Sequence, residues 1–139
     1  MPAAIATLID TGPIVASLNE KDARHAECKE SFSKLGPFVY TCWPAITEVV
    51  YLLGDYYPAT SKLFDLLKTQ TIRVLSIDQT DLGGVEDILA KYADQRFQLA
   101  DACLMHLANR EGINQVLTLD RKDFSLFRTV SGKALTLLP

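Results

Sequence analysis

The chain has 139 residues, which suits one domain with a hydrophobic core and excludes two of ordinary size, so we expect a single domain over residues 1–139. Hydrophobic residues make up 48% and charged residues 22%, which excludes a disordered chain. The net charge of −3 disfavours nucleic-acid binding at first sight, but if four of the 17 acidic residues bound metal, 13 would remain against 14 basic residues. Net charge therefore does not decide this point.

The three cysteines predict a reducing compartment. Cys28, Cys42 and Cys103 are an odd number without zinc-ligand spacing, and each lies in an apolar or amphipathic run, so we expect free, buried thiols. No stretch approaches the roughly 18 apolar residues of a membrane span. The apolar run over residues 3–9 is too short for a signal peptide and lacks a basic leader. We expect a cytoplasmic protein without a membrane partner.

The first half of the chain alternates between apolar runs and helical patterns. Residues 3–9 predict a strand buried on both faces; Asp10 ends it, and Pro13 suits the first turn of a short helix. The elements that follow are, in chain order, a helix over residues 22–35 capped by Asp22, a strand over residues 38–41, and helices over residues 44–53 and 58–68.

The second half continues the alternation. The predicted elements are, in chain order, a strand over residues 72–77, a helix from a cap at Asp78 to about residue 92, a helix over residues 99–110 that stops at Gly112, a strand over residues 115–119 and a last strand over residues 133–137. Gly83 and Gly84 predict a kink or a late start in the first of these helices, since each glycine costs a helix about 1 kcal/mol. Strands separated by helices imply parallel pairing and an α/β sandwich, whose strand order remains open.

Two aspartates directly follow strongly apolar strands. Asp10 and Asp120 should lie at the carboxyl ends of these strands, which is the edge of a parallel sheet where ligands bind. Asp78 also follows a strand, but its neighbours make it a helix N-cap, with Asp81 in the first helical turn. We assign Asp78 a structural role and treat Asp10 and Asp120 as candidate site residues.

Two further acids lie inside predicted helices. The segment around Asp101 is apolar nearly all the way round, so this carboxylate would be desolvated unless a cation or hydrogen bonds offset the cost. Glu48 lies about one turn into its helix among Ile46, Val49 and Val50. Taken singly, each of these acids also has a structural explanation. A capping or first-turn role would explain Asp101 as well as a functional site would, and a position on a solvated face of the helix would explain Glu48 equally well.

The combination of these acids predicts a metal centre. Two acids at strand ends and two near helix starts can meet at one edge of a parallel sheet, where they would raise each other's pKa unless a cation neutralised them. Oxygen ligands without His or Cys suit Mg²⁺ or Mn²⁺ rather than zinc. Such a centre, with one ion or two, activates water and stabilises the charge of a pentavalent phosphorus.

Four segments in this order resemble the PIN domain, most closely that of VapC-type toxins. They are Leu8-Ile-Asp10-Thr, Pro44-Ala-Ile-Thr-Glu48-Val-Val, Leu99-Ala-Asp101-Ala-Cys-Leu and Val116-Leu-Thr-Leu-Asp120-Arg-Lys-Asp-Phe124. The resemblance covers nearly the whole chain, and the last two segments are its most specific part. It implies a Rossmann-like three-layer α/β/α sandwich with a mostly parallel central sheet, metal-dependent ribonuclease activity, homodimerisation and, for VapC members, a cognate antitoxin.

The resemblance also implies roles for individual residues. Asp10, Glu48 and Asp101 match the first three acids of the family. The fourth is Asp120 or Asp123; we take Asp120 as the ligand and Asp123 as a supporting residue. Thr118 and Thr11 are expected to provide polar support.

Basic residues flank the third and fourth acids in sequence. They are Arg96, Arg110, Arg121 and Lys122. Contact with RNA phosphates and a role as solvated surface charges explain them equally well. His25 and His106 have no partner nucleophile or metal spacing, and Trp43 is expected in the core rather than as a platform for a base.

These observations predict an enzyme that hydrolyses phosphodiester bonds in RNA, as the toxin of a type II toxin–antitoxin pair. The alternatives are a housekeeping PIN nuclease without an antitoxin and a non-catalytic PIN scaffold that binds RNA or protein. An aspartyl-phosphate phosphatase is disfavoured because it needs a second aspartate two residues after the nucleophile, where this chain has Gly12.

The helices over residues 44–68 carry more apolar side chains than one buried stripe can absorb. Tyr51, Leu52, Tyr56 and Tyr57 are among them, and tyrosine is enriched at protein interfaces. We expect a homodimer through these helices; coverage of the core edge in a monomer is the alternative.

Overall fold

A computed structural model describes residues 5–139 and contains a parallel sheet with the strand order β3-β2-β1-β4-β5. The strands are β1 (Thr7–Ile9), β2 (Val39–Thr41), β3 (Arg73–Val74), β4 (Gln115–Leu117) and β5 (Thr136–Leu138). All four pairings are parallel, and β1 lies between β2 and β4. The carboxyl ends of the strands therefore share one edge, as the sequence predicts.

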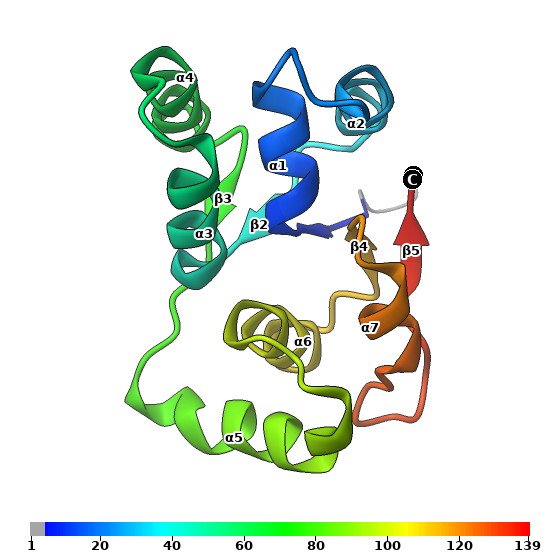
Figure 1. The fold of residues 1–139 in the computed structure, drawn as a ribbon. Helices are drawn as coiled ribbons and strands as arrows, with labels where there is room; N and C mark the ends of the chain where they lie inside the picture. The colour runs from blue at the N-terminus through cyan, green and yellow to red at the C-terminus, as the bar shows by residue number, and fades with distance from the viewer. Residues whose placement is uncertain (1–4) are drawn as a thin grey trace.

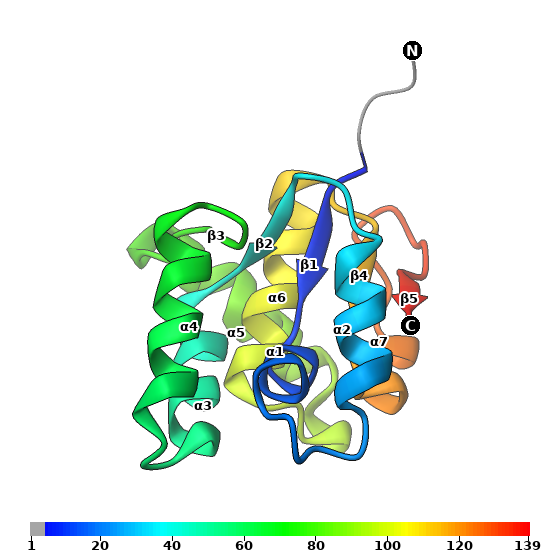
Figure 2. The same ribbon diagram turned by 90° about the horizontal axis from the view of Figure 1, so that it is seen from above.

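Helices cover both faces of this sheet (Figure 1). On one face lie α1 (Thr11–Leu18), α2 (His25–Ser33), α3 (Trp43–Leu53) and α4 (Tyr57–Lys68); Figure 2 shows α4 and α2 on either side of α1. On the other face lie α5 (Leu82–Lys91), α6 (Leu99–Glu111) and α7 (Arg121–Leu126). Two short 3₁₀ turns, η1 (Gln79–Asp81) and η2 (Ala93–Gln95), flank α5. The predicted three-layer α/β/α sandwich is confirmed.

Alternation along the central strands builds the two cores. Leu8 and Val116 face the core on the α6 side, whereas Ile9 and Leu117 face the core on the side of α1, α3 and α4. Both faces are buried, so the strands are apolar at consecutive positions. Along α6, residues 100–105 are all buried, in agreement with the prediction of a helix enclosed on most sides.

The strands are shorter than their apolar runs predict. The first begins at Thr7, and residues 3 and 4 of the predicted run lie outside the described residues; the third is only Arg73–Val74. Helix α2 begins at His25 rather than at Asp22, because the Asp22 carboxylate accepts a hydrogen bond from the Arg24 backbone in a turn before the helix (2.8 Å). Within residues 5–139 no helix is long and apolar enough to cross a membrane.

Asp78 forms the predicted cap. Its side chain accepts a hydrogen bond from Thr80 N at 2.9 Å, and the Asp81 carboxylate accepts one from Asp78 N at 2.9 Å, so the two residues complete a capping box. Asp81 is buried and also contacts two residues of α6: His106 Nε2 at 2.8 Å and Arg110 Nη1 at 3.0 Å. These hydrogen bonds hold the pKa of Asp81 well below its usual range, and they tie the start of α5 to α6.

Close packing explains one of the two unexpected glycines. A Cβ atom on Gly84 would overlap His106 Nδ1 and lie 2.5 Å from His106 Cε1, whereas a Cβ on Gly83 would have nothing within 4 Å. The imidazole has little freedom to move away, because Nε2 is bound to Asp81. Gly84 therefore lets α5 approach α6.

Gly84→Ala is expected to destabilise the protein by about 1–3 kcal/mol, because the methyl group overpacks the contact between α5 and α6. Gly83→Ala is the matched control: it adds the same group in open space and should leave stability unchanged or raise it by up to about 1 kcal/mol, since alanine favours helix. Urea unfolding of both variants provides the measurement. Equal effects of the two substitutions would contradict the packing role of Gly84.

Candidate metal centre

Asp10 follows β1 and caps α1 at the carboxyl edge of the sheet. Its Oδ1 accepts from the Thr11 backbone at 2.8 Å, and its Oδ2 accepts from the Thr118 hydroxyl at 2.8 Å. The side chain is only 5% exposed. Both oxygens are thus held in fixed directions by groups from β1–α1 and from the end of β4.

Thr118 connects Asp10 to the second strand-end acid. The strand β4 ends at Leu117, one residue before Thr118, whose hydroxyl oxygen accepts from Asp120 N at 2.9 Å while donating to Asp10. Asp120 then caps α7, with its Oδ1 accepting from Asp123 N at 3.2 Å. Thr118 therefore lies between Asp10 and Asp120 and makes a hydrogen bond with each. The Thr11 hydroxyl has another partner, the Ala45 carbonyl of α3 at 3.4 Å.

Three carboxylates form the tightest part of the cluster. One carboxylate oxygen from each of Asp101, Asp120 and Asp123 lies within 4.8 Å of the others. The sequence predicted Asp123 as a supporting residue, whereas the structure places its carboxylate beside those of Asp101 and Asp120. The signal was present in the spacing, because a residue three positions after a helix cap lies in the first turn and faces back toward the cap.

Glu48 and Asp10 border this triplet. Glu48 is half-buried on α3, and its charge raises the pKa of both Asp10 and Asp101. The hydrogen bond from Thr11 to Ala45 joins the start of α1 to the first turn of α3, which keeps Glu48 on the side of Asp10. The structure therefore brings together all four acids that the sequence singled out, together with Asp123.

Burial and crowding make these carboxylates reluctant to ionise. Burial is the largest cause that raises the pKa of Asp101 to about 8, and the charges of Asp10, Asp120, Asp123 and Glu48 add to it. Burial likewise raises the pKa of Asp10 to about 6, against the opposing hydrogen bonds from Thr118 and Thr11. Burial and neighbouring Asp120 also raise the pKa of Asp123.

Asp101 is a buried acid of the cluster to which the described residues donate no hydrogen bond. It is 7% exposed in the first turn of α6, and no residue between 5 and 139 donates a hydrogen bond to its carboxylate. A divalent cation would supply the missing positive charge, and the donor set consists only of carboxylate oxygens, which suits a hard ion. The residues present therefore fit a divalent metal.

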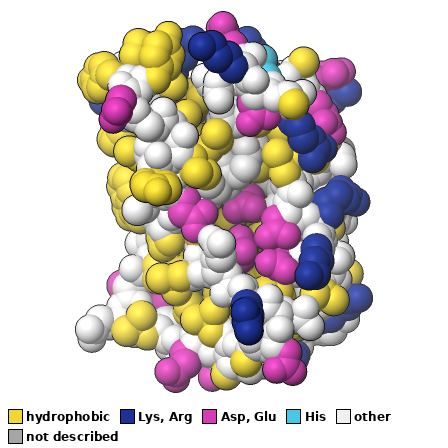
Figure 3. Space-filling view, viewed as in Figure 1, with side chains coloured by type: hydrophobic (Ala, Val, Ile, Leu, Met, Phe, Trp, Pro, Cys, Tyr) yellow, Lys and Arg dark blue, Asp and Glu magenta, His cyan; other side chains and the backbone are white. Residues whose placement is uncertain are grey.

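Figure 3 shows acidic side chains gathered in the middle of one molecular face, with lysine and arginine side chains to their right and below them. Arg96, Arg121 and Lys122 are exposed, in the loop before α6 and at the start of α7. Arg110 lies at the other end of α6, where Asp81 and Glu111 hold its guanidinium. Arg110 is therefore placed away from the acids, in a structural network.

Trp43 does not lie in the core. It is the first residue of α3 and is 54% exposed, so the expectation of a core tryptophan is wrong. Ala45 and Ile46 of the same helical turn are buried, so the start of α3 buries these two side chains and leaves that of Trp43 exposed. The three cysteines are free and buried, as predicted.

Known proteins are similar to this chain in sequence and in fold. A curated relative, Ribonuclease VapC26 of Mycobacterium tuberculosis, is 27% identical over 134 residues, which is 95% of this chain and 99% of that protein. The crystal structure of Mycobacterium tuberculosis VapC20, a Sarcin-Ricin loop cleaving toxin, has a TM-score of 0.77 at 19% identity and covers 84% of this chain and 92% of that chain.

A complex shows the same fold. VapBC2 from Rickettsia felis, bound to a DNA fragment from its promoter, has a TM-score of 0.66 at 13% identity and covers 96% of this chain and 97% of that chain. A family model described as the PIN domain matches residues 7–130, which include every acid of the cluster. By this match, and with its acids gathered at the carboxyl edge of a parallel sheet, the chain belongs to the PIN-domain family.

Proposed function

We propose that this protein is a Mg²⁺- or Mn²⁺-dependent endoribonuclease, and that it is the toxin of a type II toxin–antitoxin pair. The observation that carries the proposal is the gathering of five carboxylates at one edge of the sheet, with the pKa values of Asp10 and Asp101 raised. Such a cluster is stable in its ionised form only with a cation. The curated relative at 27% identity is named a ribonuclease, which favours RNA as the substrate.

Asp101, Asp120 and Asp123 would hold the ion, with Asp10 and Glu48 beside them as further ligands or as acceptors for bound water. When bound, a divalent ion polarises the phosphate and lowers the pKa of an attacking water. The residues of the chain contribute to catalysis by holding these acids in place. The hydrogen bonds of Thr118 and Thr11 fix Asp10, and the turn from Thr118 to Asp123 fixes the other strand-end acid.

The direct test is to incubate the purified chain with a labelled single-stranded RNA in millimolar Mg²⁺ or Mn²⁺ and to resolve the products on a denaturing gel. We expect internal cleavage that EDTA abolishes and that excess Mg²⁺ restores. Binding of RNA without cleavage in either metal would favour the alternative of a non-catalytic scaffold. Cleavage that persists in EDTA would contradict the metal centre.

An antitoxin partner is part of the proposal. Solved structures of this fold include a toxin–antitoxin complex from Klebsiella pneumoniae and the Rickettsia felis VapBC2 complex. The toxin role predicts a short neighbouring reading frame that encodes a DNA-binding protein. Its absence would leave the alternative of a housekeeping PIN nuclease. We place both proteins in the cytoplasm, where the three free thiols would stay reduced.

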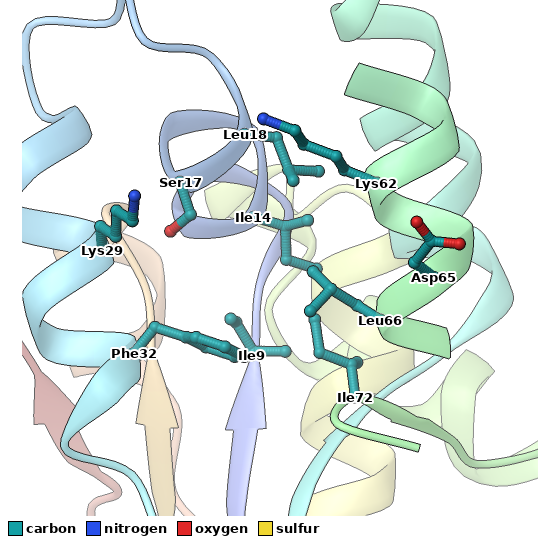
Figure 4. Close-up of a pocket in the computed structure, with 10 residues that line it drawn as sticks. All are labelled: Ile9, Ile14, Ser17, Leu18, Lys29, Phe32, Lys62, Asp65, Leu66 and Ile72. Carbon is teal, nitrogen blue, oxygen red and sulfur yellow. The ribbon is translucent and has the colours of Figure 1, made fainter. Parts of the chain in front are cut away.

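A pocket of about 350 Å³ on the α1–α4 face suits a segment of that antitoxin (Figure 4). Apolar side chains form its floor, among them Ile9, Ile14 and Ile72, and its charged lining residues are Lys29, Lys62 and Asp65, two basic and one acidic. Ser17 Oγ is buried there without a hydrogen-bond partner among residues 5–139. A segment with apolar side chains and a carboxylate would match these groups in shape and charge.

The proposed homodimer uses the exposed apolar residues of α3 and α4. Tyr51 is 83% exposed, and Leu52, Tyr56 and Tyr57 are also exposed, so together they present an apolar surface. Hydrophobic side chains occupy the left flank of the molecule in Figure 3. Large exposed apolar patches on small proteins mark interaction sites.

Light scattering of the isolated chain at tens of micromolar is expected to give twice the mass of one 15.4 kDa chain. Leu52→Glu or Tyr56→Glu should split this dimer into folded monomers, because each places a charge in an apolar interface at a cost of about 2 kcal/mol or more. A mass near 15.4 kDa for the unmodified chain would reject the dimer. A dimer that survives both substitutions would place the interface on other helices.

A further inference from the structure

The arginines of this chain differ in what their guanidinium groups contact. Five of the six have a partner: Arg24 binds Glu27, Arg73 lies over the Phe38 ring, Arg110 binds Asp81, Arg121 donates to the Pro139 carbonyl, and Arg128 donates to the carbonyls of Ser125 and Phe127. Arg96 is exposed, and its guanidinium makes no hydrogen bond or ion pair with any residue between 5 and 139. Among residues 5–139 it is the arginine whose guanidinium has no partner.

The backbone of Arg96 lies in the left-handed region, with φ 55 and ψ 47, directly after η2. Glycine and asparagine favour this conformation after a helix, and Gly112 adopts it after α6 with φ 67. A residue with a Cβ atom is strained there, and such strain is concentrated at functional sites. Within the described residues, Gln70 is the other non-glycine residue with positive φ.

Packing fixes this loop beside the acids. The next residue, Phe97, is 6% exposed and stacks on Tyr92, with ring centroids 4.9 Å apart. Leu99 then begins α6, and Asp101 lies in its first turn. From Arg96 to Leu99 the chain can span at most about 11 Å, so Arg96 stays near the end of α6 that carries Asp101.

We infer that Arg96 is a positioning residue that binds an RNA phosphate and aligns the strand across the acidic cluster. The inference rests on the proposed ribonuclease function. Carboxylates that hold a metal repel the phosphates on either side of the scissile bond, so the strand needs a fixed cation next to the cluster. Guanidinium binds phosphate through two parallel hydrogen bonds, and the packed loop holds the Arg96 backbone near the start of α6 before RNA arrives.

The test measures RNA affinity against salt in the cleavage-deficient Asp101→Asn chain, with fluorescence anisotropy of a labelled single-stranded RNA in millimolar Mg²⁺. Adding Arg96→Gly should weaken binding roughly fivefold and lower the slope of log affinity against log salt by about 0.7, the value for one lost phosphate contact on single-stranded RNA. Arg96→Lys should restore the slope, because it restores the charge.

Two controls separate charge from backbone effects. Gln70→Gly removes equivalent backbone strain at the other left-handed residue without changing charge, and Lys68→Gln removes an exposed positive charge at the end of α4. Both should leave the salt slope unchanged. The melting temperatures of Arg96→Gly and Gln70→Gly should stay the same or rise by up to about 3 °C. Arg96→Asn, which also tolerates this conformation, replaces the glycine variant if that variant folds poorly.

The outcomes distinguish this inference from the proposed function. An unchanged slope in Arg96→Gly, with RNA still bound, overturns the role of Arg96 and leaves the ribonuclease in place. Equal losses in Arg96→Gly and Lys68→Gln also overturn it, because the effect would then be one of net charge. If no variant and no unmodified chain binds RNA, the proposed substrate and the role of Arg96 fall together.

Discussion

Asp101→Asn is expected to lower the rate of RNA cleavage by about 10³-fold or more while leaving the fold intact. The substitution keeps the size of the side chain but removes the charge of the carboxylate at the centre of the cluster, within 4.8 Å of Asp120 and Asp123. Loss of a group that acts only with its neighbours removes nearly all of their joint effect. Gel analysis of a labelled RNA in Mg²⁺ gives the rate, and circular dichroism checks the fold.

Asp78→Asn is the matched control for this experiment. Asp78 also follows β3 at the carboxyl edge of the sheet, but its side chain caps η1 through Thr80 N and Thr80 Oγ1. Asparagine caps helices about as well as aspartate, so cleavage and stability should both be retained. Full activity in Asp101→Asn would remove Asp101 from the proposed centre. Equal losses in the two variants would point to a general effect of charge at this edge.

The sequence predicts at which edge of the sheet the site lies, but it predicts the arrangement of the acids within the site less well. Apolar runs ending at Asp10 and Asp120 predict that both residues lie at the carboxyl ends of strands. The structure agrees, and it adds that these two strands are parallel neighbours. Periodicity gives no strand order, because every pair of parallel strands presents the same pattern. The position of the Asp123 carboxylate beside those of Asp101 and Asp120 depends on the turn after Thr118. In this turn the Thr118 hydroxyl connects Asp10 to Asp120, and such a turn leaves no periodic signal in the sequence.

Three other differences between prediction and structure depend on tertiary packing around single residues. Trp43 is apolar and follows a buried strand, but the first turn of α3 packs Ala45 and Ile46 into the core and leaves Trp43 exposed. Arg110 follows Asp101 by nine residues on one helix, so closeness in sequence places it at the opposite end, beside Asp81. Gly84 is a poor helix former, and only the tertiary contact with His106 explains its presence. In each case the position of the residue depends on whether a segment distant in sequence contacts it, which the local sequence pattern does not show.

The metal-free protein is expected to lose stability as the pH rises from about 4 to 8. Folding raises the pKa of Asp10 to about 6 and that of Asp101 to about 8, mainly through burial, from an ordinary value of 3.8. Below pH 4 both groups are protonated in the folded and unfolded states and cost nothing. Between pH 4 and the pKa of each group in the folded chain, the unfolded chain has already released the proton that the folded chain retains. Each group therefore lowers the free energy of unfolding by up to about 1.4 kcal/mol per pH unit.

Asp101→Asn isolates the contribution of one carboxylate to this dependence. The variant should retain only the parts due to Asp10, between about pH 4 and 6, and to Asp123, whose pKa is also raised, and in EDTA at pH 8 it should be more stable than the unmodified chain by a few kcal/mol. Asp81 does not confuse the comparison, because its lowered pKa affects stability only below about pH 4. Urea unfolding at several pH values in EDTA provides the free energies.

Millimolar Mg²⁺ should reverse the order of the two proteins near pH 8. The ion binds the ionised cluster of the folded chain and not the unfolded chain, so it stabilises the folded state and offsets the cost of ionising Asp10 and Asp101. Asp101→Asn lacks a ligand at the centre of the cluster and should gain much less from Mg²⁺. The gain of the unmodified chain should shrink toward pH 5, where protons compete with the ion for the carboxylates. Parallel pH curves for the two proteins in EDTA, or equal gains from Mg²⁺, would contradict a metal centre built around Asp101.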